Sequence, residues 1–439
     1  MGRFSFPMAQ ARAEALGEIH ARPFALVGKS RVIFQLAFLT DGGAVVDHAV
    51  LAGLARARGV AVPGRDTAHF SMPWGQGTLR WERHTEFSTY FWDAPAPPKF
   101  GEGIDTHPFG DQFSPPGNMI SGIRLEVRAD SPETRAALES FDPTSLCLSE
   151  VKGGQAKIAT DFRQDGDGLT RILVIDNGMT DAVRGAVVQR LLDIETYRTL
   201  AAMGLSLARS LSPEMRRIED GLTKITQSMK TGARDNADSL LAEITILAAE
   251  LEAGAALSLY RFGASRAYYN IVGERIASLA ETQEPGFETI GAFLEKRLAP
   301  ALRTCQSIEE RQANLSRKLS RATSLLRSWI DVELERQNSA LLSSMNRRVK
   351  LQLRMQQTVE GLSVAAISYY IVGLFGYLAK AVVDAFHLPV KAGLLSGLFV
   401  PVAIGFTWMV VRSIRKHHDI EGGAATPDGE QVATESIQR

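Results

Sequence analysis

The chain has 439 residues, 49 basic and 49 acidic side chains, and a formal net charge of zero. This balance gives no reason to expect nucleic acid as a partner, because nucleic-acid-binding domains carry clustered excess positive charge. Cys147 and Cys305 are far apart in sequence, which is usual for a reducing compartment and excludes a zinc site built from cysteines. The first twenty residues lack a long apolar core, so we expect no signal peptide.

The first 180 residues have the pattern of an α+β domain. An apolar run of strand length covers 31–40, and apolar and polar residues alternate over 78–92, which fits one bent strand or a pair. Alternation returns over 123–128. A hairpin is expected from 156–162 and 170–175, which flank the turn sequence QDGDG.

An irregular loop is expected over 93–117, which is rich in Pro and Gly. From Thr180 onwards Gly and Pro become scarce, and the sequence predicts helices. Thr180 and Asp181 are suited to cap the first of them. Ser212-Pro213-Glu214 is expected to start another, because Pro is favoured in the first helical turn. Helical pattern continues to about 280, where QEPGF breaks it.

A long helix is predicted from Pro300 towards the C-terminus, because no further Pro and no Gly occurs before Gly361. It carries a coiled-coil spacing of alternating steps of four and three. The first seam comprises Ile308, Leu315, Leu319, Ala322, Leu326 and Trp329, with Gln312 in its one polar gap; the second comprises Leu342, Met345, Val349 and Leu353. Either the earlier helices of the same chain or other subunits must cover such a stripe, and both alternatives stay open.

Two stretches without any charged residue follow, at 362–379 and 392–411. Each is long enough to cross a hydrocarbon core of roughly 30 Å, so they predict a transmembrane hairpin that uses the lipid bilayer as a partner. Basic residues gather before the first stretch and after the second, which favours cytoplasmic locations for both termini. The blander alternative is a pair of buried core helices.

The expected architecture is therefore an α+β cytoplasmic domain followed by a long-helix bundle or stalk and a two-helix transmembrane hairpin. We expect the boundaries 1–179 for the α+β domain, 180–299 for a helical domain, 300–361 for the stalk helix, 362–411 for the hairpin and 412–439 for a basic, then disordered tail.

This order of elements resembles that of the CorA-type divalent-cation channels over 180–418. In that family the first span ends in a Gly-Met-Asn motif that forms the ion filter. Here Gly376 matches the glycine, but Tyr377 and Leu378 replace the other two residues. The resemblance implies an oligomeric channel ancestor, and the replaced residues argue against magnesium uptake.

A closer resemblance is to an uncharacterised family of bacterial membrane-anchored proteins. It depends on the segments EIHARPF (18–24), WERHTEF (81–87) and DIETYR (193–198), and on Tyr369-Tyr370 in the first apolar stretch. The resemblance covers nearly the whole chain, and it implies a location in the inner (cytoplasmic) membrane of a bacterium. That family has no assigned activity, so the resemblance implies a relative and not a function.

Three groups of polar residues are candidates for a binding site. Glu82, His84 and Glu86 alternate, so in a strand they would share one face and could bind a divalent metal; a solvated polar face is the simpler interpretation. Glu18, His20 and Arg22 have the same spacing and could bind an anionic effector or form a surface ion pair. Glu195 and Arg198 are expected to pair on a helix. No cofactor is expected.

The first apolar stretch has one face that is smaller and more polar than the rest, comprising Tyr369, Gly373, Gly376, Tyr377 and Lys380. This face would line an axis in a ring of subunits, or it would pack against the second stretch. Gly393 and Gly397 form a G-x-x-x-G, which lets helices approach closely.

Common catalytic signatures for phosphate binding, nucleophilic catalysis and zinc hydrolysis are missing, so the chain is not expected to be an enzyme. Two functions remain: an oligomeric CorA-like protein that moves an ion, or a membrane-anchored scaffold or regulator without transport activity. A homo-oligomer is expected from the seams and the paired glycines.

Overall fold

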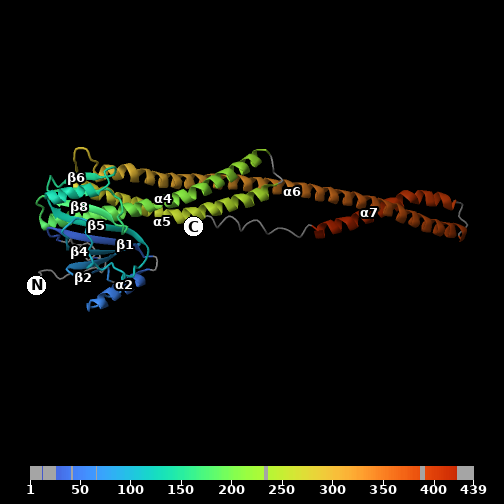
Figure 1. Cartoon of the computed structure of the whole chain (residues 1–439). Coiled ribbons are helices and arrows are strands. Elements are labelled where there is room, and N and C mark those ends of the chain that lie inside the picture. The colour runs from blue at the N-terminus through green and yellow to red at the C-terminus, as the bar shows by residue number, and fades with distance from the viewer. Residues whose placement is uncertain are drawn as a thin grey trace, which may run out of the picture. The chain divides into compact units, whose positions relative to one another are not determined.

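The computed structural model describes residues 12, 26–40, 43–65, 67–231, 236–385 and 391–422. The chain divides into two compact units, 1–327 and 328–439. The N-terminal part of the first unit is an α/β domain with a mixed sheet, and long helices follow it (Figure 1).

The sheet has nine strands among the described residues, in the order β2-β3-β4-β1-β5-β8-β7-β6-β9. Neighbouring strands are antiparallel except for β5 and β8, which are parallel. The strand bounds are Arg31–Leu39 (β1), His69–Trp74 (β2), Gly77–Arg83 (β3), Phe87–Pro95 (β4), Met119–Ala129 (β5), Cys147–Val151 (β6), Ala156–Thr160 (β7), Thr170–Asp176 (β8) and Thr282–Gln283 (β9). The strands expected near 31–40, 123–128, 156–162 and 170–175 are confirmed, and 78–92 forms the pair β3 and β4.

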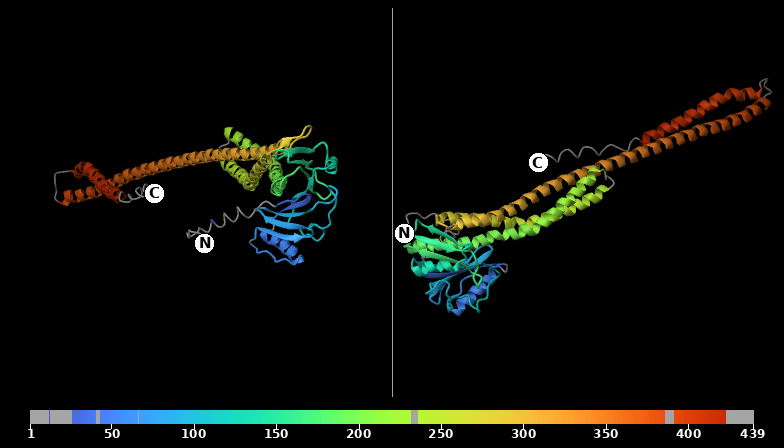
Figure 2. Two further views of the ribbon diagram at one scale, coloured as in Figure 1. Left: turned by 90° about the vertical axis from the view of Figure 1, so that its left-hand side faces the viewer. Right: turned by 45° about the horizontal axis from the view of Figure 1, so that its top comes forward.

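Helices cover both faces of this sheet (Figure 2). On one face, Ile33 of β1 packs with residues of α4 (Asp181–Lys230), α5 (Ala237–Leu279) and the beginning of α6 (Ile290–Ala385). On the other face, Phe34 packs with Trp81 and Trp92 beneath α2 (Ala44–Ala57). The short helices α3 (Pro132–Ala136) and η1 (Ala137–Ser140) also precede β6 on this side. Successive side chains of a strand point to opposite faces, so neighbouring residues of β1 enter different cores.

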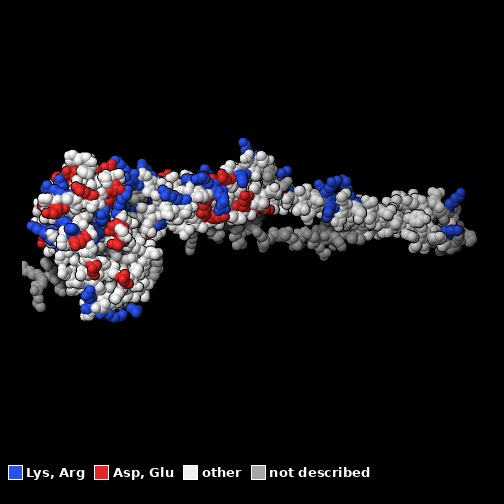
Figure 3. Space-filling model, in the orientation of Figure 1, with Lys and Arg blue, Asp and Glu red and all other residues white. Residues whose placement is uncertain are grey.

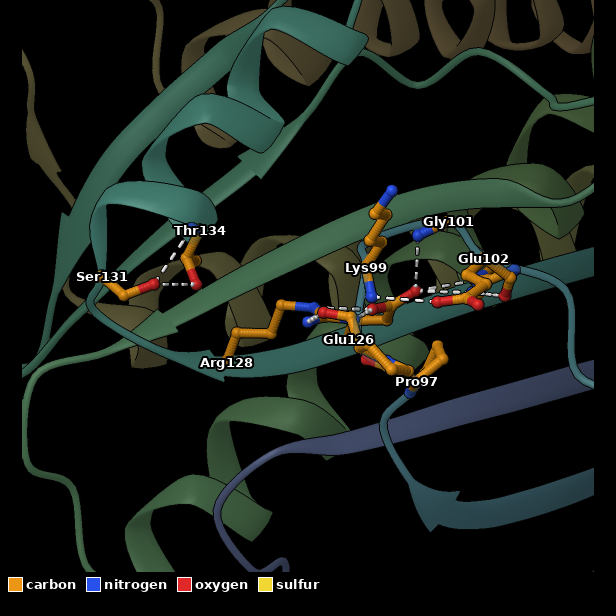
Figure 4. A network of polar contacts seen from close by, with 10 residues as sticks. Pro97, Lys99, Gly101, Glu102, Glu126, Arg128, Ser131 and Thr134 are labelled. Carbon is orange, nitrogen blue, oxygen red and sulfur yellow. Dashed lines mark hydrogen bonds and ion pairs between the residues drawn. The ribbon is translucent and has the colours of Figure 1, made fainter.

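The Pro- and Gly-rich segment after β4 contains no helix or strand, as expected, but it is fastened to the sheet. The Glu126 carboxylate of β5 is fully buried and accepts hydrogen bonds from Arg124, from Arg128 and from the Gly101 N–H at 3.0 Å (Figure 4). Arg124 and Arg128 in turn donate to backbone carbonyls of this segment. A buried carboxylate is stable only when it is paired and hydrogen-bonded, and here its partners hold the loop in place.

Two predicted helix starts are wrong. Helix α4 runs unbroken through Pro213, and α6 begins at Ile290, so that Pro300 lies inside it. Each proline removes one intrahelical hydrogen bond, which is a local cost. The helices continue through both prolines because residues on either side of each proline are packed in the core, and tertiary packing overrides local propensity. The predicted cap is confirmed: the Thr180 hydroxyl accepts a hydrogen bond from the Val183 N–H at 3.4 Å.

The first α6 seam is covered within the chain. Five of its six apolar members are buried, namely Ile308, Leu315, Leu319, Ala322 and Leu326, and the last, Trp329, is half-buried. Ile308 packs with Leu211 of α4 and Phe262 of α5. The polar gap is filled by a specific contact, since the Ser258 hydroxyl donates to the Gln312 side-chain oxygen at 3.0 Å. Of the two alternatives, the intramolecular one therefore holds for this seam.

The second unit consists of the rest of α6 and of α7 (Ala392–Gly422). The second α6 seam, at Leu342, Met345, Val349 and Leu353, is more than half exposed. Further along, the two helices pack as a hairpin: Phe375 stacks on Phe399 with ring centroids 3.9 Å apart, and Ser368 and Ala403 are buried. On the face in view, Figure 3 shows this unit as largely uncharged, with separate groups of Lys and Arg.

Candidate functional site

A cavity of about 300 Å³ lies in the first unit between the sheet and the long helices. Strands β1, β3 and β4 form one wall, and α4 and α5 form the other. Two segments far apart in sequence, WERHTEF and DIETYR, meet here, since residues of both line the cavity. The cavity is at the small end of ligand pockets and therefore suits a small molecule.

On the sheet side, the cavity is lined by Arg80 and Glu82 of β3 and by His84, the residue that follows this strand. The three side chains share one face because they alternate along the chain. Leu79 and Trp81, which directly precede Arg80 and Glu82, belong to the core on the opposite face of the sheet. The Arg80 guanidinium lies 5.0 Å from the centre of the Phe91 ring, and the His84 ring stacks on Phe87 at 4.2 Å. His84 Nε2 is 3.4 Å from the Thr89 hydroxyl.

On the helix side, the lining residues hold one another in position. Asp193 accepts hydrogen bonds from Arg275 of α5 at 2.7 Å and from Gln189 at 2.9 Å. The Gln35 amide of β1 donates to the Thr196 hydroxyl at 3.1 Å across the wall of the cavity. These contacts fix α4 and α5 relative to the sheet, so the cavity is preformed.

Aromatic rings close one end of the cavity. Phe87 contacts Tyr197 edge-on at 6.1 Å, and Tyr197 stacks on Tyr268 of α5 at 5.4 Å. The Tyr268 hydroxyl donates to Glu86 at 2.6 Å, and Arg261 also donates to Glu86. Burial and the adjacent carboxylate raise the pKa of Tyr268, so this hydroxyl remains a donor at neutral pH.

The alternating Glu82, His84 and Glu86 do not meet as a metal site. Strand β3 ends at Arg83 and the chain turns before Phe87, so the alternation fails at Glu86, which binds Arg261 and Tyr268 instead. Glu82 and His84 line the cavity, so the solvated-face interpretation is also incomplete. Within the ranges that the structure describes, no group of three or more His, Cys, Asp or Glu side chains is placed to hold a metal ion.

The expected pair of Glu195 and Arg198 forms, and the Thr170 hydroxyl also donates to Glu195. Glu18, His20 and Arg22 lie outside the described residues.

The small, polar face of the first apolar stretch is divided. Gly376 lies against α7, where a side chain would meet Ser396 at 3.3 Å, whereas Tyr369 and Tyr377 are about four-fifths exposed. Gly393 and Gly397 have no atom close to where a side chain would extend, so the α6–α7 hairpin does not use them.

Several lining residues were not singled out from the sequence. Arg80 shares its strand face with Glu82, so the same alternation could have identified it. Gln35, Arg190 and Arg275 gave no such signal, because only the packing of α4 and α5 on the sheet brings them to the cavity.

Two of the described helical segments are long and apolar enough to cross a membrane, one within 290–383 and one over 393–413. A comparison with curated proteins found no match. The family model for proteins of unknown function DUF3422 matches residues 7–418. The two apolar segments and the two motifs that meet at the cavity all lie within this match, and the chain belongs to the DUF3422 family.

Proposed function

We propose that this protein is a membrane-anchored regulator: its α/β domain binds a small molecule in the cavity, and its two apolar helices hold it in a bilayer. The proposal assigns it no catalytic role. Support for a binding role comes from the preformed cavity, whose charged and aromatic side chains converge from β3, β4, α4 and α5.

The observation that carries the anchor is the exposure of the apolar segments. Only 6% of the most apolar window of α6 and 11% of that of α7 are buried within the chain. Buried core helices would be covered by the protein, so the core-helix alternative does not account for these values. Hydrocarbon is the cover that suits charge-free faces of this length.

The anchor is tested by membrane extraction. We expect the full-length protein to sediment with membranes and to resist alkaline carbonate, and to be released by detergent. Replacing Leu374 and Leu398, both strongly exposed, with Asp should weaken this retention, because charge inside a bilayer is costly. Release of the wild-type protein by carbonate would overturn the anchor.

The basic residues that flank the two apolar segments support a topology with both termini in the cytoplasm. A reporter fused after Arg439 should behave as cytoplasmic, and one inserted near Phe386, outside the described residues, as external. A periplasmic signal from the C-terminal fusion would overturn this topology.

Ion transport is the second candidate, favoured by the exposed polar groups on α6. Tyr369, Tyr377 and Lys380 are exposed, so they are accessible to an axis formed by several copies. A ring of lysines would repel divalent cations, so we expect no efficient magnesium passage and increased cation flux for Lys380→Glu. Liposome flux assays with both proteins test this. Absence of ion flux with both proteins would favour the membrane-anchored regulator. Robust magnesium flux that does not depend on the charge at position 380 would show that Lys380 does not face the ion path.

A further inference from the structure

The cavity contains two opposite charges that do not neutralise each other. Arg80 and Glu82 are neighbours on one face of β3, with α-carbons about 6.6 Å apart by strand geometry. Each is partly buried and lines the cavity. Within the part of the chain that the structure describes, neither side chain takes part in an ion pair or a hydrogen bond.

The other acidic group of the cavity differs from Glu82. Asp193 is bound by Arg275 and Gln189, so its charge is compensated inside the protein. Phe91 beneath Arg80 gives the guanidinium a defined position without neutralising it. Glu82 and Arg80 are therefore a separated anion and cation beside an aromatic wall formed by Phe87, Phe91 and Tyr197.

Partial burial of an uncompensated charge is unfavourable, and a ligand with complementary charges reverses that cost. A ligand with a single negative group would satisfy Arg80 but would add repulsion at Glu82, and an amine would do the reverse. A molecule that carries both a carboxylate and an ammonium on the same carbon satisfies both side chains at once.

We propose that the cavity binds a free amino acid with an apolar side chain. Its carboxylate pairs with Arg80, its ammonium pairs with Glu82, and its side chain lies against Phe87 and Phe91. The volume of about 300 Å³ suits a molecule of this size. This inference rests on the proposed function, since it names the ligand class of the same cavity.

The test uses the full-length protein in detergent. Thermal-shift measurements with each of the twenty common amino acids at about 10 mM select the strongest binder, and titration calorimetry then measures its affinity. The same amino acid is compared with its analogue lacking the ammonium and its analogue lacking the carboxylate; for phenylalanine these are 3-phenylpropionate and 2-phenylethylamine. We expect both analogues to bind at least tenfold more weakly than the amino acid.

Charge-neutralising variants assign each contact. Glu82→Gln should weaken binding of the amino acid by roughly 10- to 100-fold, the range for a hydrogen bond to a charged group, and should strengthen binding of the acid analogue, because it removes a repulsion. Arg80→Gln should weaken binding of the amino acid equally and strengthen binding of the amine analogue for the same reason. The matched control is Arg217→Gln with Glu250→Gln, an exposed pair of α4 and α5 away from the cavity, which should leave affinity unchanged.

Failure to bind any of the twenty amino acids would overturn the proposal, as would equal affinity for the amino acid and its analogues. Binding of 3-phenylpropionate alone, reduced by Arg80→Gln, would reject the amino acid but retain a small-molecule receptor. Carbonate extraction is independent of these outcomes, so failure of the anchor and failure of the ligand class are distinguishable.

Discussion

Residues 308–326 and 342–353 belong to the same helix and carry the same alternation of apolar positions, yet their environments are opposite. Leu326 is fully buried against the helices of its own chain, whereas Leu342 is 66% exposed. The earlier seam differs because α4, which ends at Lys230, and α5, which begins at Ala237, pack against it. A heptad pattern thus shows that a face requires cover but does not identify the partner.

Buried and exposed charged residues differ in the same way as buried and exposed apolar residues. The largest effect on the free energy of unfolding is expected at a buried ion pair. Arg184 is fully buried and donates to Asp176, Asp181 and the carbonyls of Val27 and Met179. Arg184→Met should lower the free energy of unfolding by about 3–5 kcal/mol, because it leaves Asp176 charged and unpaired. Urea denaturation followed by tryptophan fluorescence measures this. Arg347→Met, in the exposed part of α6, is the control and should change little.

The two seams of α6 are compared directly by truncation. Leu326→Ala should cost about 2–5 kcal/mol through lost burial and a cavity, whereas Leu342→Ala should stay within about 0.5 kcal/mol for the monomer. Equal effects in urea denaturation of dilute, detergent-solubilised protein would show that another copy covers the second seam under those conditions.

A buried carboxylate of α2 gives a smaller effect on stability, and this effect depends on pH. Burial raises the pKa of Asp47, although the Ser88 and Tyr90 hydroxyls donate to its Oδ1 atom; among the described residues its Oδ2 atom has no hydrogen-bond partner. A raised pKa in the folded state means that the wild type loses stability as pH rises above the usual Asp range.

Asp47→Asn keeps an acceptor for Ser88 and Tyr90 but removes this dependence. We expect the variant to gain about 1 kcal/mol on the wild type between pH 4 and pH 7, as the wild-type carboxyl ionises. Melting temperatures across this range measure the difference. A constant difference at every pH would contradict the assignment to Asp47.

The smallest effect on the chain itself is expected at the glycines of α7. Gly393→Leu with Gly397→Leu should leave the α6–α7 hairpin intact, because nothing lies near either position, and should weaken association between copies. Gly376→Leu is the matched variant and should disturb the hairpin at Ser396. Light scattering in mild detergent measures the association. A wild-type protein that is monomeric in several detergents would contradict the expected homo-oligomer.

Properties that depend on neighbouring residues could be predicted from the sequence. The strand β1, the hairpin of β7 and β8, the cap at Thr180 and the two charge-free stretches follow from local alternation, turn residues and composition. The local sequence pattern does not identify strands β2 and β6, because such short elements give weak periodic signals, or helix α2, whose mostly apolar and small residues give a weak helical period.

Tertiary structure decided what depends on distant partners. Packing carried α4 through Pro213, placed the first seam of α6 inside the chain, and drew Glu86 away from Glu82 and His84 to Arg261 and Tyr268. It also made a cavity from residues of β1, β3, β4, α4 and α5. Local spacing fixes which side chains share a face, but burial and charge pairing are settled only when segments remote in sequence come into contact.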